Sequence, residues 1–294
     1  MTHQRTEVFM GTLVTIHVVS EPAGMDAEAA MDRAFEWFQE VEERCSRFDP
    51  QSELMQLTAR ASRPVKASTI LYEAVRFALS VAEETDGAFD PTVGHRMAAK
   101  GFDQEHRTGK VLTTRVNAPE DVSWRDVKLD AARQTVMLRR PLTLDLGAVA
   151  KGLAIDTAAR VLEPLGDFSI DAGGDLYMGG RNAEGGPWVV GIRHPRRDGE
   201  LIDKLSVSNQ AVCTSGDYEK PDHIVAARRA PPGRALASAT VVAPGAMLAD
   251  ALATAAFALG AAEGLRLLER VGVAGLLITP ELERFEAGDL RHVA

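Results

Sequence analysis

Apolar residues recur at helical spacing in several separate parts of the chain. Between Ala27 and Arg44 they come every three or four positions, as at Ala34, Phe38 and Val41, and charged residues fill the positions between them. Such spacing predicts a helix with one buried face. The same reasoning predicts helices over residues 69–85 and 247–260, and a helix followed by a strand within residues 264–280.

Other segments have the β-branched content and loose alternation of strands. Residues 6–19 read TEVFMGTLVTIHVV and predict a strand interrupted at Met10 and Gly11, where a glycine indicates a bulge or a close ligand. A second strand signal turns at Gly173 and Gly174, which lie between two aspartates. Further strand signals follow in WVVGIRHP, KLSVSNQAVCTSGDYE and ASATVVAP.

The mixture of helical and strand patterns indicates the class of fold. No stretch rich in Pro, Gly or Ser divides the chain, and no segment repeats another convincingly. We therefore expect a single compact domain over residues 1–294, with residues 281–294 as a peripheral tail. We expect an α+β fold in which mixed or antiparallel sheets and flanking helices surround a ligand cleft.

Composition and charge set limits on the partners. Hydrophobic residues make up 45% of the chain and charged residues 26%, as in globular proteins. The formal net charge is -9, and basic residues are scattered apart from residues 193–197 and 228–234, which argues against nucleic acid as the main partner. The two cysteines, Cys45 and Cys213, show no metal-ligand spacing and no disulfide framework, so we expect two free buried thiols.

The apolar runs do not favour membrane insertion. The longest run, at residues 251–262, is shorter than the roughly 20 residues that a spanning helix needs. The first residues lack the basic start, apolar stretch and cleavage site of a signal peptide, and no cysteine near them could carry a lipid. We therefore expect a cytoplasmic protein.

The stretch LDLGAVAKGLAID, residues 144–156, has the pattern of a strand, a tight turn and the start of a helix. An apolar run from Leu138 ends at Asp145, Gly147 loosens the backbone, and a helix-forming run follows from Ala150. Unpaired N–H groups at a helix start can hold an anion or a phosphate, and Lys151 adds a cation there. The alternative is a plain connection between a buried strand and a helix.

The helix predicted over residues 247–260 carries one charged residue, Asp250, with Thr254 one turn further on. A carboxylate in an apolar helix is costly to bury unless it is paired or bound to a metal. Asp250 and Thr254 supply hard oxygen donors, which suit Mg²⁺ or Ca²⁺ better than zinc. The alternative for Asp250 is a capping role near the start of this helix.

The segment GAFDPTVG predicts a rigid loop. Pro91 holds Asp90 extended, and Gly94 follows shortly after, so the loop presents the Asp90 carboxylate and the Thr92 hydroxyl. The alternative is a solvated turn in which the Asp90 side chain bonds the backbone of its own loop. Together, the glycine turns, this carboxylate loop and the pair Asp250 and Thr254 suit a bound polyphosphate or dinucleotide. Neither GxGxxG nor a Walker A sequence occurs, so we do not expect a fold of the Rossmann type.

A set of motifs occurs in one order along nearly the whole chain: MGT at Met10, SRFDPQSEL, GAFDPTVG, DLGAVAKG, DAGGD, TSGDYE, the pair His223-Ile224, and ADALATA. In this succession the chain resembles the ApbE-like family, the FAD:protein FMN transferases. The resemblance implies a compact α+β fold that binds FAD in a cleft and uses Mg²⁺ to cleave its pyrophosphate. It also implies that FMN passes to a Thr hydroxyl of an acceptor flavoprotein and that AMP is released.

Carried over by position, the resemblance implies roles for individual residues. The Mg²⁺ ligands would be the side chains of Asp250 and Thr254 and the backbone carbonyl of Ala150. Lys151 would meet the phosphates. The other FAD contacts would come from Met10, Phe48, Ala88, Phe89, Asp90 and Ala154.

His223 resembles the histidine of the family's HxxDP segment, which suits a base that takes the proton from the acceptor Thr. This chain departs from that pattern, because Ile224 to Ala227 follow His223 and the Asp-Pro pair is absent. Two alternatives to transfer therefore stay open: an FAD pyrophosphatase that gives FMN to water, and an FAD-binding protein without turnover.

Overall fold

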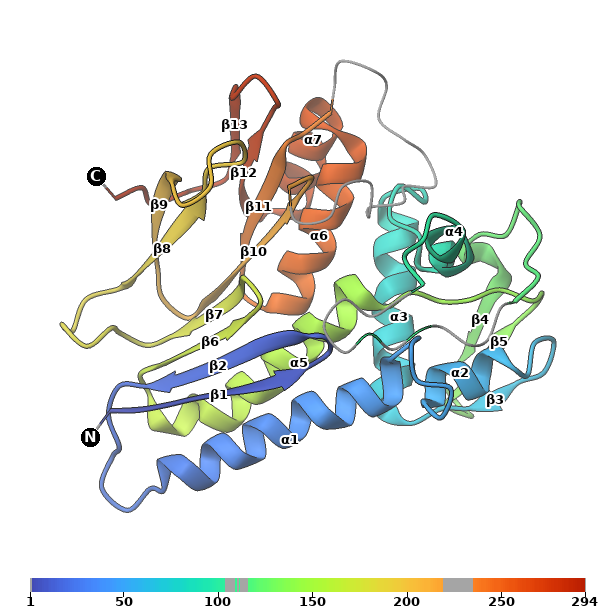
Figure 1. Cartoon of the computed structure of the whole chain (residues 1–294), viewed down its shortest axis with the longest axis horizontal. Coiled ribbons are helices and arrows are strands. Elements are labelled where there is room, and N and C mark those ends of the chain that lie inside the picture. Colours follow the sequence, from blue (N-terminus) through green and yellow to red (C-terminus); the bar gives the residue numbers. More distant parts are fainter. Residues whose placement is uncertain (1, 104–108, 110, 112–115, 219–234, 294) are drawn as a thin grey trace.

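The computed structural model describes residues 2–103, 109, 111, 116–218 and 235–293, and Figure 1 shows how their helices and strands are arranged. Helices and antiparallel sheets mix along these residues, which confirms the expected α+β class.

The largest sheet has eight strands, and each strand is antiparallel to its neighbours. In spatial order they are β1 (His3–Phe9), β2 (Thr12–Val18), β6 (Phe168–Ala172), β7 (Asp175–Gly179), β10 (Gln210–Gly216), β11 (Ser238–Ala243), β12 (Ala274–Ile278) and β13 (Arg284–Ala287). The C-terminal tail that we expected to be peripheral therefore contributes an edge strand, β13.

Long helices pack along one face of this sheet (Figure 1). They are α1 (Ala27–Cys45), α5 (Gly147–Leu162), α6 (Ala246–Leu259) and α7 (Ala261–Val271), while α3 (Thr69–Glu84) packs against α1, α5 and α6. Asp26, which accepts a hydrogen bond from Ala29 N, caps α1, and Ser68 caps α3 in the same way through Leu71 N. Helix α5 contacts both α1 and α6, so it lies between them.

Smaller elements complete the described part of the chain. A three-stranded sheet has the order β3 (Val65–Lys66), β5 (Thr135–Leu138) and β4 (Val127–Asp130), and a two-stranded sheet pairs β8 (Trp188–Arg193) with β9 (Leu201–Val207). The short helices are α2 (Glu53–Thr58), α4 (Gly94–Ala99) and the 3-10 turns η1 (Pro91–Val93), η2 (Trp124–Asp126) and η3 (Glu163–Leu165).

The strands β10 to β12 separate two hydrophobic cores. Alternate side chains of a strand point to opposite faces, so Cys213 joins the large core beneath the helices while its neighbour Val212 joins a smaller one. Val190 and Leu205, from β8 and β9, cover that second face. The main sheet is thus covered by helices on one side and by the small β8–β9 sheet on the other.

The sequence left a bulge and a close ligand as alternatives at Met10 and Gly11, and these residues form not a bulge but the turn of a hairpin. Phe9 pairs with Thr12, and the two residues between them have φ angles of 51° and 71°. Two positive φ angles are typical of the tight turns that match the twist of paired strands. Gly173 and Gly174 form the equivalent turn between β6 and β7, and Gly173 N donates to Leu13 O, so the two hairpins are held together.

The strand expected to end at Asp145 is also not formed. Strand β5 stops at Leu138, and Leu142 and Leu144 are fully buried without belonging to a β ladder. Helix α5 begins at Gly147 and not at Ala150, because the Asp145 carboxylate accepts a hydrogen bond from Gly147 N at 2.8 Å and starts the helix earlier.

Helices α5 and α6 approach each other closely. Gly152 lies against the backbone of α6, where an added Cβ would come within 2.6 Å of the carbonyl carbon of Ala246. One turn further along α5, the Asp156 carboxylate accepts hydrogen bonds from Ala246 N at 2.5 Å and Met247 N at 3.1 Å. Asp156 thus satisfies the first N–H groups of α6 from the neighbouring helix.

Among the described residues, no helix combines the length and the apolar character needed to cross a membrane.

We predict that Gly152→Ala lowers the free energy of unfolding by about 1–3 kcal/mol, because the new methyl group must push α6 away from α5. Gly186 is the matched control, since its Cβ would meet nothing closer than 3.8 Å and Gly186→Ala should stay within about 0.5 kcal/mol of the wild type. Urea unfolding measures both variants. Equal stability of the two would contradict the close contact.

Candidate functional site

A cavity of about 340 Å³ lies where several loops and helix ends converge. Its wall is formed by the loop after α1, the loop before η1, the start of α5, the turn between β6 and β7, the end of β10 and one face of α6. Seven residues that the sequence predicted for the site line it: Phe48, Ala88, Phe89, Asp90, Lys151, Asp250 and Thr254.

A smaller cavity of about 120 Å³ adjoins the first and shares five lining residues with it. The shared residues are Arg47, Phe48, Asp145, Gly147 and Lys151. Met10 and Ala150, also predicted for the site, line this smaller cavity. Ala154 lines neither, because it lies one turn further along α5 and is fully buried in the core.

Three charged side chains meet on the wall of the larger cavity. Lys151 Nζ lies 3.1 Å from Asp250 Oδ2 and also pairs with the carboxylate of Asp175. Asp175 and Asp250 are only 5% and 7% exposed, so both carboxylates depend on the ammonium group for compensation. The sequence pointed to the two aspartates of the β6–β7 turn but did not predict that Asp175 would meet Lys151.

Asp250 does not cap α6. The helix has Gly245 at its N-cap position without a side-chain cap, and Asp156 binds its first N–H groups. The Asp250 side chain instead points from the next turn toward Lys151. Thr254, one turn further on, lies with its Oγ1 3.1 Å from Ser215 Oγ of β10, so both residues face the same cavity.

Two of the three expected magnesium ligands, Asp250 and Thr254, line the larger cavity, and Ala150 lines the adjoining one. The described residues contain no group of three or more His, Cys, Asp and Glu side chains placed to hold a metal ion. The expected ligands are of another kind, since they are one carboxylate, one hydroxyl and one backbone carbonyl. A buried carboxylate beside a hydroxyl on a cavity wall suits a hard cation that takes its remaining ligands from phosphate and water.

The Asp90 carboxylate is bound within its own loop. Its Oδ1 accepts hydrogen bonds from Thr92 N at 2.9 Å and Thr92 Oγ1 at 2.7 Å, and its Oδ2 accepts one from Trp124 N at 3.2 Å. This is the local side-chain bond that the sequence left open as an alternative, although Asp90 is buried and not solvated. Asp90 shapes the cavity wall and holds the loop that carries Ala88 and Phe89.

Arg47 is a part of the site that sequence reasoning missed. It is only 7% exposed, and its Nε lies 2.9 Å from Asp145 Oδ2 while Nη2 donates to Phe102 O at 2.7 Å. Its guanidinium lies over the ring of Phe48, 4.3 Å from the ring centre. The only signal was its place beside Phe48 in the motif SRFDPQSEL, since its partners are remote in sequence.

Both cysteines are free and buried, as expected. Burial raises the pKa of Cys45, which lines the smaller cavity, to about 12. Burial, and after it the nearby Asp250 carboxylate, also raises the pKa of Cys213 well above its usual range. A raised pKa disfavours the thiolate form, which is the reactive form of cysteine.

His223, the expected base, lies outside the described residues.

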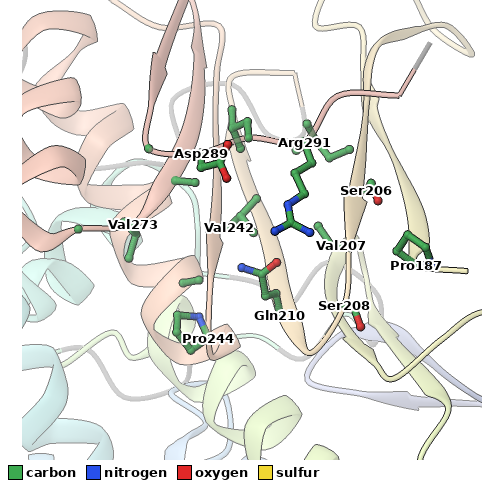
Figure 2. Close-up of a pocket in the computed structure, with 16 residues that line it drawn as sticks. Pro187, Ser206, Val207, Ser208, Gln210, Val242, Pro244, Val273, Asp289 and Arg291 are labelled. Atoms are coloured by element: carbon green, nitrogen blue, oxygen red, sulfur yellow. The ribbon is translucent and has the colours of Figure 1, made fainter.

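A second hollow, of about 560 Å³, lies between β9, β10 and the C-terminal segment, and Figure 2 shows Gln210 and Arg291 among its lining residues. None of the predicted site residues that the structure describes borders it. Its wall combines apolar side chains such as Val207 and Val242 with exposed polar ones, and it lacks the buried charges of the first cavity.

Comparisons with known proteins point to one family. The profile described as the ApbE family matches residues 10–277. The FAD:protein FMN transferase of Treponema pallidum is 31% identical over 95% of this chain and 85% of that protein, and the one of Haemophilus influenzae is 29% identical over 81% and 75%. The crystal structure of the ApbE protein from Thermotoga maritima superposes with a TM-score of 0.84 at 28% identity, covering 98% of this chain and 97% of that one. These matches confirm the resemblance that the ordered motifs predicted.

We predict that Arg47→Met lowers the free energy of unfolding by about 3 kcal/mol, because it leaves the largely buried Asp145 carboxylate without its partner. Arg125→Met is the matched control. Arg125 also stacks on an aromatic ring and pairs with a carboxylate, that of Asp86, but both charged groups are exposed, so its loss should cost less than about 1 kcal/mol. Urea unfolding at neutral pH compares them, and similar losses would show that the Arg47 pair is not structural.

Proposed function

The chain belongs to the ApbE family, and from that membership we propose that it is a FAD:protein FMN transferase. In the proposed reaction FMN passes from FAD to the hydroxyl of a Thr residue in an acceptor flavoprotein, AMP is released, and Mg²⁺ is required. The observation that best supports this proposal is the meeting of Lys151 with Asp250. The cation predicted to bind phosphate and the carboxylate predicted to bind the metal were assigned separately along the sequence, and their side chains lie 3.1 Å apart on one cavity wall.

The shape of the site supports a ligand with two ring systems joined by phosphates. Two adjoining cavities share Lys151 and the start of α5, so a cation stands at their junction. Phe48 and Phe89 give the larger cavity aromatic side chains, and Met10 gives the smaller one a flexible apolar side chain. Such walls suit aromatic rings, while the junction suits the pyrophosphate.

The charges of the site support chemistry at that pyrophosphate. Mg²⁺ held by Asp250, Thr254 and the Ala150 carbonyl would neutralise charge on the phosphate oxygens. Lys151 would hold the phosphate from the other side as a point charge. The surrounding aspartates, Asp145 and Asp175, are each bound to a cationic side chain, which limits their repulsion of the incoming phosphates.

In the transfer step the Thr oxygen of the acceptor would form a bond to the FMN phosphorus as the bond from that phosphorus to the AMP oxygen breaks. The hydroxyl proton would pass to a base, the role proposed for His223, and AMP would leave with its phosphate ionised. A cytoplasmic location of the acceptor stays a prediction from the sequence.

The altered segment after His223 keeps hydrolysis and simple binding as competing outcomes, and one assay separates the three. Purified protein is incubated with FAD and Mg²⁺, with and without candidate flavoprotein acceptors, and AMP, free FMN and covalent flavin are measured by mass spectrometry. Covalent flavin on an acceptor Thr supports transfer. Free FMN and AMP without an acceptor would identify a pyrophosphatase, and bound FAD with no product would identify a binding protein.

We predict that Asp250→Ala reduces Mg²⁺-dependent AMP release by about 100-fold or more, because it removes the carboxylate proposed to hold the cation. Asp198→Ala is the control, since Asp198 is exposed and borders none of the cavities, and its rate should match that of the wild type. Unchanged metal-dependent turnover in Asp250→Ala would refute the site assignment.

A further inference from the structure

The ammonium group of Lys151 lies between two carboxylates that come from different elements. Lys151 belongs to the first turns of α5, Asp175 begins β7, and Asp250 lies on α6. The lysine pairs with both carboxylates, and all three side chains are largely buried. One positive charge therefore compensates two negative ones, and the group keeps a net charge of about -1.

The two aspartates are not held in the same way. Asp175 Oδ1 accepts a hydrogen bond from Thr214 N of β10 at 3.4 Å, so the backbone of the sheet helps to fix its carboxylate beside Lys151. Among the described residues, Lys151 is the hydrogen-bond donor to Asp250. The bond to Asp250 is thus the one that can be exchanged without disturbing the sheet.

The proposed roles of Lys151 and Asp250 conflict with their ion pair. A divalent cation bound to Asp250 would lie close to an ammonium group that is itself 3.1 Å from the same carboxylate, and like charges at such a separation repel strongly in a partly buried site. This repulsion opposes binding of the metal and of Lys151 to Asp250 at the same time.

We propose that Lys151 is an exchangeable counter-ion that occupies the metal-binding carboxylate until the substrate arrives, and that Asp175 is a positioning residue that retains the lysine during the exchange. This inference rests on the proposed function. When a pyrophosphate enters, Lys151 turns from Asp250 to a phosphate oxygen while it remains paired with Asp175. Asp250 is then released to the divalent cation.

The exchange makes metal and substrate binding cooperative. Without FAD, Lys151 competes with the cation for Asp250 and weakens its binding, and a bound phosphate removes this competition. Each ligand then raises the affinity for the other by the same factor, which for couplings of this kind is typically about 5- to 150-fold.

The test measures Mn²⁺ binding to the full chain in the absence of FAD, by the loss of the electron paramagnetic resonance signal of free Mn²⁺. Lys151→Gln should bind Mn²⁺ at least about fivefold more tightly than the wild type, because two carboxylates lose their competing cation. Lys151→Arg should stay near the wild-type affinity. Asp175→Asn should bind Mn²⁺ more weakly, because Lys151 then pairs with Asp250 alone and competes more strongly with the metal for that carboxylate.

Asp198→Asn, at an exposed position, is the control for charge removal and should change nothing. Thermal melting with and without Mn²⁺ verifies that each variant is folded, and the opposite shift expected for Asp175→Asn provides a second test if Lys151→Gln does not fold. An affinity of Lys151→Gln equal to or weaker than that of the wild type would overturn the exchange. So would Mn²⁺ binding that is the same in Asp250→Ala and the wild type.

Failure of the proposed function would look different from failure of this inference. If the wild type forms no covalent flavin on any acceptor but Lys151→Gln binds Mn²⁺ more tightly than the wild type, the proposed transfer is refuted and the counter-ion exchange is supported. If the wild type transfers FMN but Lys151→Gln binds Mn²⁺ with unchanged affinity, the proposed function is supported and the counter-ion exchange is refuted.

Discussion

The close packing of α5 against α6 is the constraint on which the candidate site depends. Gly152 lets the two backbones approach, and Asp156 binds the first N–H groups of α6. With the helices held at this distance, Lys151 of one reaches Asp250 of the other. This packing buries the Asp156 carboxylate, which is unfavourable for its charged form. Burial raises the pKa of Asp156, although its two backbone hydrogen bonds act in the opposite direction.

The main sheet supplies a further part of the site. The turns at Met10 and Gly173 lie side by side because Gly173 N donates a hydrogen bond to Leu13 O. Met10 lines the smaller cavity, and Gly173 lines the larger one. Asp175, directly after the second turn, then meets Lys151. Arg47 closes the opposite wall by joining the loop after α1 to Asp145, next to the start of α5. Rigid turns, helix starts and paired charges thus surround a hollow whose wall carries the Lys151 ammonium group.

Sequence reasoning predicted the elements better than their ends and contacts. Helical periodicity located α1, α3 and α6, and the ordered motifs identified the family and brought together most of the cavity lining. Residues 6–19 were read as one interrupted strand in place of the two strands β1 and β2, because a two-residue hairpin turn barely interrupts the strand pattern. The pairing of Arg47 with Asp145 and of Asp175 with Lys151 could not be predicted, since no local pattern specifies partners that far apart in the chain. Contact with FAD stays a prediction for Met10, Phe48, Ala88, Phe89, Asp90, Lys151 and Ala154.

The most direct test is a crystal structure of the protein with FAD and Mn²⁺, with the metal located by its anomalous scattering. We expect one Mn²⁺ bound by the Asp250 carboxylate, the Thr254 hydroxyl and the Ala150 carbonyl, with Lys151 on a phosphate oxygen. A metal bound away from Asp250, or Lys151 still paired with Asp250 while FAD fills the cavity, would contradict the assignment of this site.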